Sequence, residues 1–98
     1  MSFGLDVTAI GSASVTLSWT PPTEYEDGSP LTDLDGYYIY YGDEKGDYPN
    51  VIHIENESIS TYVVGNLSEK TYYFVATSYN SQGVESRRSN VAKKEATP

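Results

Sequence analysis

The sequence feature that most limits the possible folds is the segment from Thr71 to Asn80, TYYFVATSYN. It combines aromatic, β-branched and small residues and contains no glycine, proline or charged residue, which is typical of a central β-strand. Successive side chains of a strand point to opposite faces, so both faces of this strand would carry aromatic rings. Only one face can line the core of a small two-sheet domain. We therefore expect a row of tyrosines on the outside.

Short segments with alternating apolar and polar residues recur along the rest of the chain, and none shows helical periodicity. We expect strands at residues 5–10, 14–20, 36–42, 51–55, 60–64 and 90–94. The segment at 14–20 places Val15, Leu17 and Trp19 on one face and is followed by two prolines, which cannot continue a central ladder. Trp19 therefore belongs to the predicted core. The whole pattern predicts an all-β sandwich.

Length and charge narrow the classes of protein and partner. The chain has 98 residues, which suits one hydrophobic core, so we expect a single domain over residues 1–98. Fourteen acidic residues face six lysines and arginines, and the formal net charge of −8 disfavours nucleic acid and anionic membrane surfaces as partners. There is no cysteine and no apolar stretch as long as a transmembrane helix, so we expect no disulfide and no membrane insertion.

Residues for catalysis are sparse. His53 is the only histidine, and no Gly-x-Ser-x-Gly motif or metal-ligand spacing of cysteine and histidine accompanies it. A chain of this size also has little room for a cleft that holds two carboxylates at a fixed separation. We therefore expect a protein that is not an enzyme and that uses no cofactor.

An acidic polar segment separates the second and third predicted strands. It contains turn signals at Asp27-Gly28 and Ser29-Pro30. Its carboxylates belong to Glu24, Glu26, Asp27, Asp33 and Asp35. Their spacing does not match the calcium-binding loop of an EF-hand. We favour a solvated acidic loop, and calcium binding by Glu24 to Asp35 stays open as the alternative.

Three motifs together resemble a fibronectin type III domain. They are SVTLSWTPP at 14–22, GYYIYYG at 36–42 and NLSEKTYYFVATSYNSQGVESRRSN at 66–90. The resemblance spans nearly the whole chain and implies a seven-stranded antiparallel immunoglobulin-like β-sandwich without catalytic residues. The chain is most similar to the bacterial version of this family, which has a long acidic loop ending in a Gly-Tyr strand and an Asn-Ser-x-Gly-x-Glu-Ser turn.

The bacterial version implies a context for the chain. Such modules are spacers, stabilisers or adhesive units of longer secreted or cell-surface proteins, often beside polysaccharide-degrading enzymes. The resemblance thus implies an extracellular or cell-surface location, a module taken from a longer protein, and neighbouring domains as partners. The cell-binding Arg-Gly-Asp tripeptide of some animal members is absent from the loop at 81–86.

The register of the sixth strand follows from the family's corner tyrosine, which normally bonds to backbone upstream. Counted back from Asn80 this residue is Tyr72, and counted forward from Leu67 it is Tyr73. We choose Tyr72, although a shift of one position would reverse every side chain of the strand. The predicted core then consists of Leu17, Trp19, Tyr37, Ile39, Leu67, Tyr72 and Phe74.

With this register, four tyrosines are expected on one exposed face: Tyr38, Tyr40, Tyr73 and Tyr79. Exposed aromatic rows can bind sugar rings or the apolar surface of a protein, so these four are the candidate binding residues for a polysaccharide or a protein. Cross-strand aromatic pairs also stabilise a sheet, by about 0.2–1 kcal/mol each. We favour this stabilising role and keep binding by the tyrosine face as the alternative.

Overall fold

Seven β-strands make up the regular structure in the computed structural model, which describes residues 3–25 and 27–97. The strands are β1 (Leu5–Gly11), β2 (Ser14–Trp19), β3 (Leu34–Gly42), β4 (Asn50–Ile54), β5 (Thr61–Val64), β6 (Thr71–Asn80) and β7 (Ala92–Glu95). Each overlaps one of the segments predicted to be strands, and the bounds of β6 agree at both ends. No helix able to cross a membrane occurs among the described residues.

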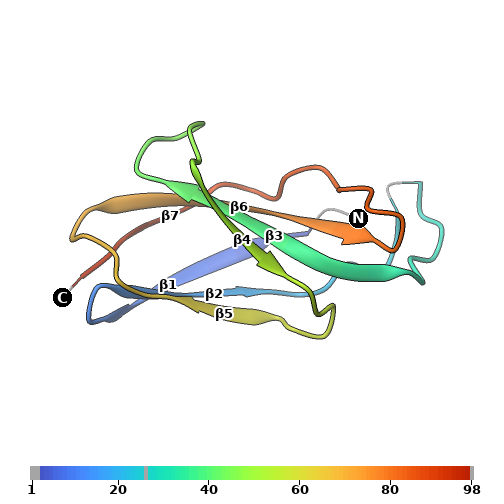
Figure 1. The fold of residues 1–98 in the computed structure, drawn as a ribbon, viewed down its shortest axis with the longest axis horizontal. Helices are drawn as coiled ribbons and strands as arrows, with labels where there is room; N and C mark the ends of the chain where they lie inside the picture. Colours follow the sequence, from blue (N-terminus) through green and yellow to red (C-terminus); the bar gives the residue numbers. More distant parts are fainter. Residues whose placement is uncertain (1–2, 26, 98) are drawn as a thin grey trace.

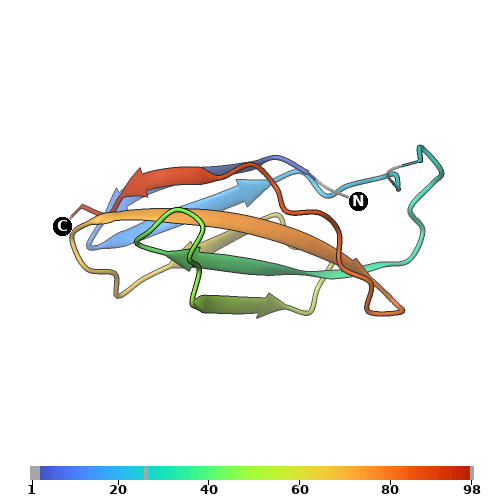
Figure 2. The same cartoon turned by 90° about the horizontal axis from the view of Figure 1, so that it is seen from above.

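The strands form two antiparallel sheets that pack face to face (Figures 1 and 2). One has the order β1-β2-β5 and the other the order β4-β3-β6-β7. The predicted seven-stranded immunoglobulin-like sandwich is therefore confirmed. The molecule measures 42 × 24 × 18 Å, and the described chain begins and ends toward opposite ends of the long axis (Figure 1).

The core lies between the two sheets. All the predicted core residues are buried: Leu17, Trp19, Tyr37, Ile39, Leu67, Tyr72 and Phe74. Trp19 is only 7% exposed, and its ring meets Tyr37 edge to face at 5.2 Å between centroids. Such tilted aromatic pairs are favoured by the ring quadrupoles, in addition to the burial of apolar area.

The corner tyrosine fixes how the chain crosses from one sheet to the other. The Ser68 backbone N–H donates a hydrogen bond to the Tyr72 hydroxyl oxygen at 3.0 Å. Tyr72 and Phe74 face the core, whereas Tyr73 is half-buried on the opposite face of the sheet. The structure therefore assigns the corner position to Tyr72.

The end of the described chain is tied to two loops of the sandwich. The Ala96 N–H donates to the Lys70 carbonyl at 3.0 Å, and the Thr97 carbonyl accepts from the Ala13 N–H at 2.7 Å. Ala13 lies in the β1–β2 turn with a positive φ of 54°, and its carbonyl accepts from the Leu67 N–H at 3.0 Å. These bonds restrict the direction in which residues 96–97 leave the sandwich.

Candidate binding surface on the four-stranded sheet

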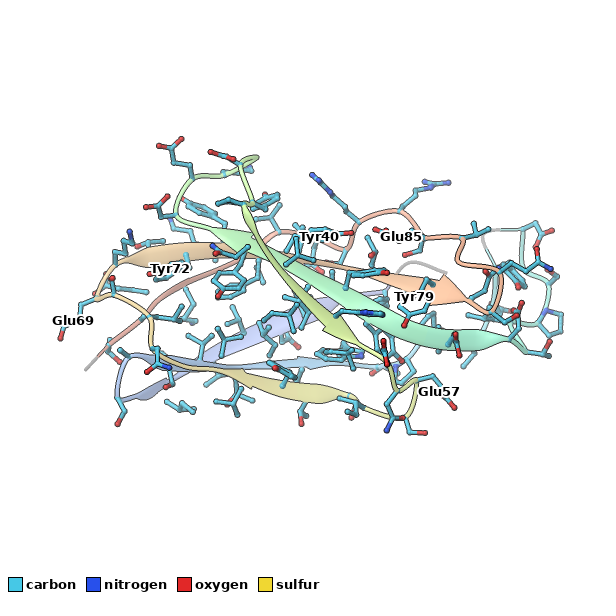
Figure 3. All side chains as sticks on the ribbon, in the orientation of Figure 1. Tyr40, Glu57, Glu69, Tyr72, Tyr79 and Glu85 are labelled. Carbon is cyan, nitrogen blue, oxygen red and sulfur yellow. The ribbon has the colours of Figure 1, made fainter. Side chains whose placement is uncertain are left out.

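Aromatic residues gather on the outer face of the four-stranded sheet because the strand register places them side by side. Tyr38 of β3 lies between His53 of β4 and Thr77 of β6. Tyr40 is the next outward-facing residue of β3, and its neighbour on β4 is Val51. Figure 3 shows Tyr40, Tyr79 and Glu85 on this side of the molecule.

The rings on this face pack against one another and form a small aromatic cluster of Tyr38, Tyr40, His53 and Tyr79. Tyr38 stacks on His53 with centroids 4.6 Å apart and an interplanar angle of 17°. It also contacts Tyr79 at 5.1 Å and Tyr40 at 6.2 Å between centroids. The His53 Nε2 atom and the Tyr79 hydroxyl share a hydrogen bond. The rings thus cover one another instead of forming a flat platform.

The expectation of four exposed tyrosines is wrong for Tyr79, which is only 9% exposed. The side chain is covered because it packs over Gly36, where an added Cβ would lie 2.7 Å from the Tyr79 ring. Tyr38 and His53 cover it further. Tyr38, Tyr40 and Tyr73 are half-buried, and Tyr73 makes no ring contact with any residue that the structure describes. The structure thus brings three of the four candidates together.

A carboxylate completes the cluster on the side of the β6–β7 connection. The Tyr40 hydroxyl donates to Glu85 Oε2 at 2.7 Å, and the Thr77 hydroxyl donates to the same oxygen at 2.8 Å. Burial, together with this carboxylate, raises the pKa of Tyr40 to about 12. Burial also raises the pKa of Tyr79. Both hydroxyls therefore stay protonated at neutral pH, where they serve as hydrogen-bonding groups and not as nucleophiles.

Sequence reasoning did not single out Arg88, which the structure places against this cluster. Its guanidinium carbon lies 5.8 Å from the centroid of the Tyr40 ring and 5.4 Å from that of Tyr48. Tyr48 belongs to the β3–β4 connection, far from Arg88 in the sequence. No local pattern links these two residues, so only the fold could reveal the contact.

Two carboxylates of the acidic loop, those of Asp27 and Asp33, accept hydrogen bonds from neighbouring side chains and backbone. Asp33 accepts hydrogen bonds from the Tyr25 hydroxyl and, at 3.2 Å, from Ser81. Asp27 accepts from both the hydroxyl and the N–H of Ser29, and the hydroxyl bond lowers its pKa. Glu26 lies outside the described residues. Among residues 3–25 and 27–97, no three acidic or histidine side chains are grouped as a metal site would need.

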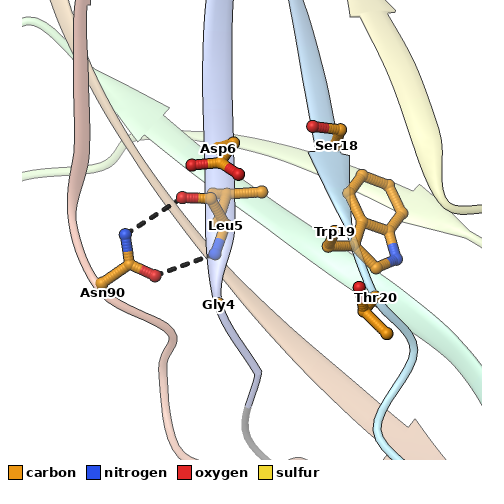
Figure 4. A pocket seen from close by; sticks show the side chains of 7 residues that line it. All are labelled: Gly4, Leu5, Asp6, Ser18, Trp19, Thr20 and Asn90. Carbon is orange, nitrogen blue, oxygen red and sulfur yellow. Dashed lines mark hydrogen bonds between the residues drawn. The ribbon is translucent and has the colours of Figure 1, made fainter.

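A second surface feature is a hollow of about 490 Å³ beside β1 (Figure 4). It is lined by Gly4, Leu5, Asp6, Ser18, Trp19, Thr20 and Asn90. The Asn90 amide oxygen accepts from the Leu5 N–H at 2.8 Å, and its amide nitrogen donates to the Leu5 carbonyl at 3.0 Å. Because the amide uses both its oxygen and its nitrogen in this way, Asn90 serves to attach β1 to the segment before β7.

Comparisons with known proteins identify a matching family and similar folds. The model of the fibronectin type III domain family matches residues 3–95. No curated protein sequence matches the chain. Two similar solved structures are much longer than this chain. The chicken CNTN1 FN1-FN3 domains match with a TM-score of 0.81 and 17% identity over 100% of this chain and 32% of that chain. The beta-1,2-glucanase from Parabacteroides distasonis matches with a TM-score of 0.76 and 17% identity over 98% of this chain and 12% of that chain.

A third similar structure is close to this chain in length. It is the fn3 domain of the human collagen alpha-1(XX) chain, with a TM-score of 0.71 and 21% identity over 96% of this chain and 82% of that chain. At these identities the solved structures show the fold alone. The family model, in contrast, matches nearly all of the sequence. On the strength of that match and of the sandwich topology, the chain belongs to the fibronectin type III family.

Proposed function

We propose that this chain is a non-catalytic module that acts as a spacer or interaction unit in a bacterial secreted or cell-surface protein. Fibronectin type III domains are generally non-catalytic and are commonly used for spacing or interaction. The observation that carries the proposal is that the described chain begins and ends in opposite halves of a 42 Å long axis (Figure 1). Neighbouring domains joined at these ends would be held apart.

The bacterial context is supported by the sequence motifs and by one structural match. The long acidic loop and the turn after β6 are similar to those of bacterial members of the family. The match to part of a beta-1,2-glucanase is consistent with a place beside a polysaccharide-degrading enzyme. These features support a secreted or surface protein as the parent.

The spacer role can be tested by placing the domain between two folded reporter proteins that carry spin labels. We expect a narrow distance distribution, shifted to longer distances than in a direct fusion of the reporters by less than the 42 Å length of the domain, because the described chain begins inward of the β2–β3 connection (Figure 1). The control is a Gly/Ser linker with the same number of residues, which behaves as a flexible coil and gives a broad distribution. A distribution as broad as that of the linker would argue against a rigid spacer.

A second candidate function is binding through the aromatic face, and the observation in its favour is the contact of Arg88 with Tyr40. The cluster rings are tilted by 31° and 40° in two of their contacts, which does not suit stacking on a planar row of sugars. A protein partner therefore fits this face better than a polysaccharide. Equal retention of the wild type and Tyr40→Ala on insoluble polysaccharides is the result that we expect.

A further inference from the structure

Arg88 is restrained on the outer face of the four-stranded sheet before any partner arrives. Its guanidinium carbon lies within 6 Å of the ring centroids of Tyr40 and Tyr48, at 5.8 and 5.4 Å. Cation–π contacts of this kind contribute about 0.5–1 kcal/mol at exposed positions. One ring belongs to β3 and the other to the β3–β4 connection, so two separate parts of the chain restrict the movement of the guanidinium. Restraint of this kind reduces the conformational entropy that binding would otherwise cost.

The hydrogen-bonding capacity of Arg88 is left open. Arg88 makes no hydrogen bond and no ion pair with any residue in the described ranges 3–25 and 27–97. Lys70, in contrast, is paired with Asp43 at 2.8 Å. A guanidinium offers five N–H donors in a planar fork that matches the two oxygens of a carboxylate. Arg88 is thus oriented, charged and available.

We propose that Arg88, positioned by Tyr40 and Tyr48, anchors a protein partner by binding an aspartate or glutamate side chain on that partner's surface. The proposal rests on the interaction role proposed above and names its partner chemistry. Val51 lies beside Tyr40 on the same face and is 55% exposed, so it adds apolar area next to the Tyr40 ring. Arginine and tyrosine next to apolar surface form the usual centre of a protein interface.

The charge of the domain favours a single carboxylate over a polyanion. With a formal net charge of −8, the domain repels a polymer that carries a charge on every unit. A lone carboxylate among apolar or basic residues meets the local attraction of Arg88, reduced by the Glu85 carboxylate on the Tyr40 hydroxyl, while more distant charges are screened at physiological ionic strength. A protein surface fits this requirement better than an acidic polysaccharide.

The test starts from a selection of random peptides, displayed on phage, against the whole domain. We expect enriched peptides that carry an aspartate or glutamate next to apolar residues. Synthetic copies should lose at least tenfold in affinity for Arg88→Gln, and the same for Arg88→Lys, which keeps the charge but not the fork. Replacing the peptide's carboxylate by an amide should weaken binding to the wild type similarly. Lys93→Gln removes one exposed charge beside Tyr73 on the same sheet, so it should bind like the wild type.

Several results would overturn the assignment to Arg88. They are a selection without enrichment, equal binding by Arg88→Gln or by the amide peptide, and retention on polygalacturonate that depends on Arg88. Thermal unfolding shows whether each variant is folded. If Arg88→Gln is not, Tyr48→Ala replaces it, since this variant keeps the charge and removes one restraining ring. Affinity equal to that of the wild type would then refute the proposal. The reporter distances of the spacer test are independent of all these outcomes.

Discussion

At the scale of single residues, three of the outward-facing side chains of β6 are as buried as the core, although Tyr73 is only half-buried. Val75 and Thr77 are 1% and 2% exposed, although both point away from the space between the sheets. They lie beneath the tyrosines of β3, and Thr77 also bonds to Glu85. Aromatic rings that lean over smaller neighbours explain how one strand can be buried on both faces without a third layer.

The corner tyrosine leads to a prediction at this scale. Tyr72→Phe removes the acceptor of the Ser68 N–H and should lower the free energy of unfolding by about 1–2 kcal/mol, because a part-buried donor loses its partner. Urea denaturation followed by Trp19 fluorescence measures the change. Tyr73→Phe is the matched control, since this neighbour is half-buried and faces the other way. An equal loss in both variants would contradict the assignment.

The residues show why some side chains could be placed from the sequence and others could not. Trp19 belongs to a segment whose alternation alone predicts that it faces the core, whereas the inward position of Phe74 also required choosing Tyr72 as the corner tyrosine. The burial of Tyr79 depends on the empty space above Gly36 and on the approach of His53 from β4. Arg88 meets its two tyrosines only after three separate segments have come together. Contacts between distant segments carry no local signal.

At the scale of elements, the existence of the seven strands was predictable, but the path of the β6–β7 connection was not. The sequence suggests a polar turn there, whereas the chain runs beside β6 through bonds from the Ser86 N–H to Ser78 and from the Ser89 N–H to Ala76. These two bonds are 2.7 and 2.8 Å long. Irregular strands of this kind lack alternating apolar residues, so periodicity does not detect them.

Asn90 gives the prediction for this scale, because its side chain is what holds this irregular segment to β1. Asn90→Ala removes two hydrogen bonds to Leu5 and should lower the free energy of unfolding by about 1–3 kcal/mol. Hydrogen exchange should show that the substitution accelerates the opening of the β1 amides more than that of the β6 amides. Asn50→Ala, which removes a single exposed bond to Tyr41 at the edge of β4, is the control. Unchanged exchange in β1 would show that other contacts hold the strand.

At the scale of the whole molecule, four tyrosines should make the stability of the fold decrease at alkaline pH. A hydrogen bond to Asp33 raises the pKa of Tyr25, and burial raises those of Tyr37, Tyr40 and Tyr79. A raised pKa means that the folded protein holds its protons more tightly than the unfolded chain does. The stabilisation is thus complete below pH 10. As pH rises further, the unfolded chain ionises first, and stability falls.

The loss should continue until the pH passes the pKa of Tyr40, at about 12. Urea denaturation at a series of pH values measures how steeply the free energy of unfolding falls with pH. The slope should be smaller in Tyr40→Phe, because this variant lacks one of the four tyrosine protons whose release is linked to unfolding. Glu85→Gln should lower the pKa of Tyr40 and leave it above 10, since burial is the larger cause. Stability that does not change between pH 10 and 12 would contradict this account.

The double burial of β6 also bears on protein engineering. Designers who graft new recognition onto the flat side of such a sandwich assume that its outward positions are free to vary. Here Val75, Thr77 and Tyr79 are not. Randomising them would yield mostly misfolded clones, so new specificity would have to be built at the rim of the sheet, around exposed positions such as Val51 and Val84.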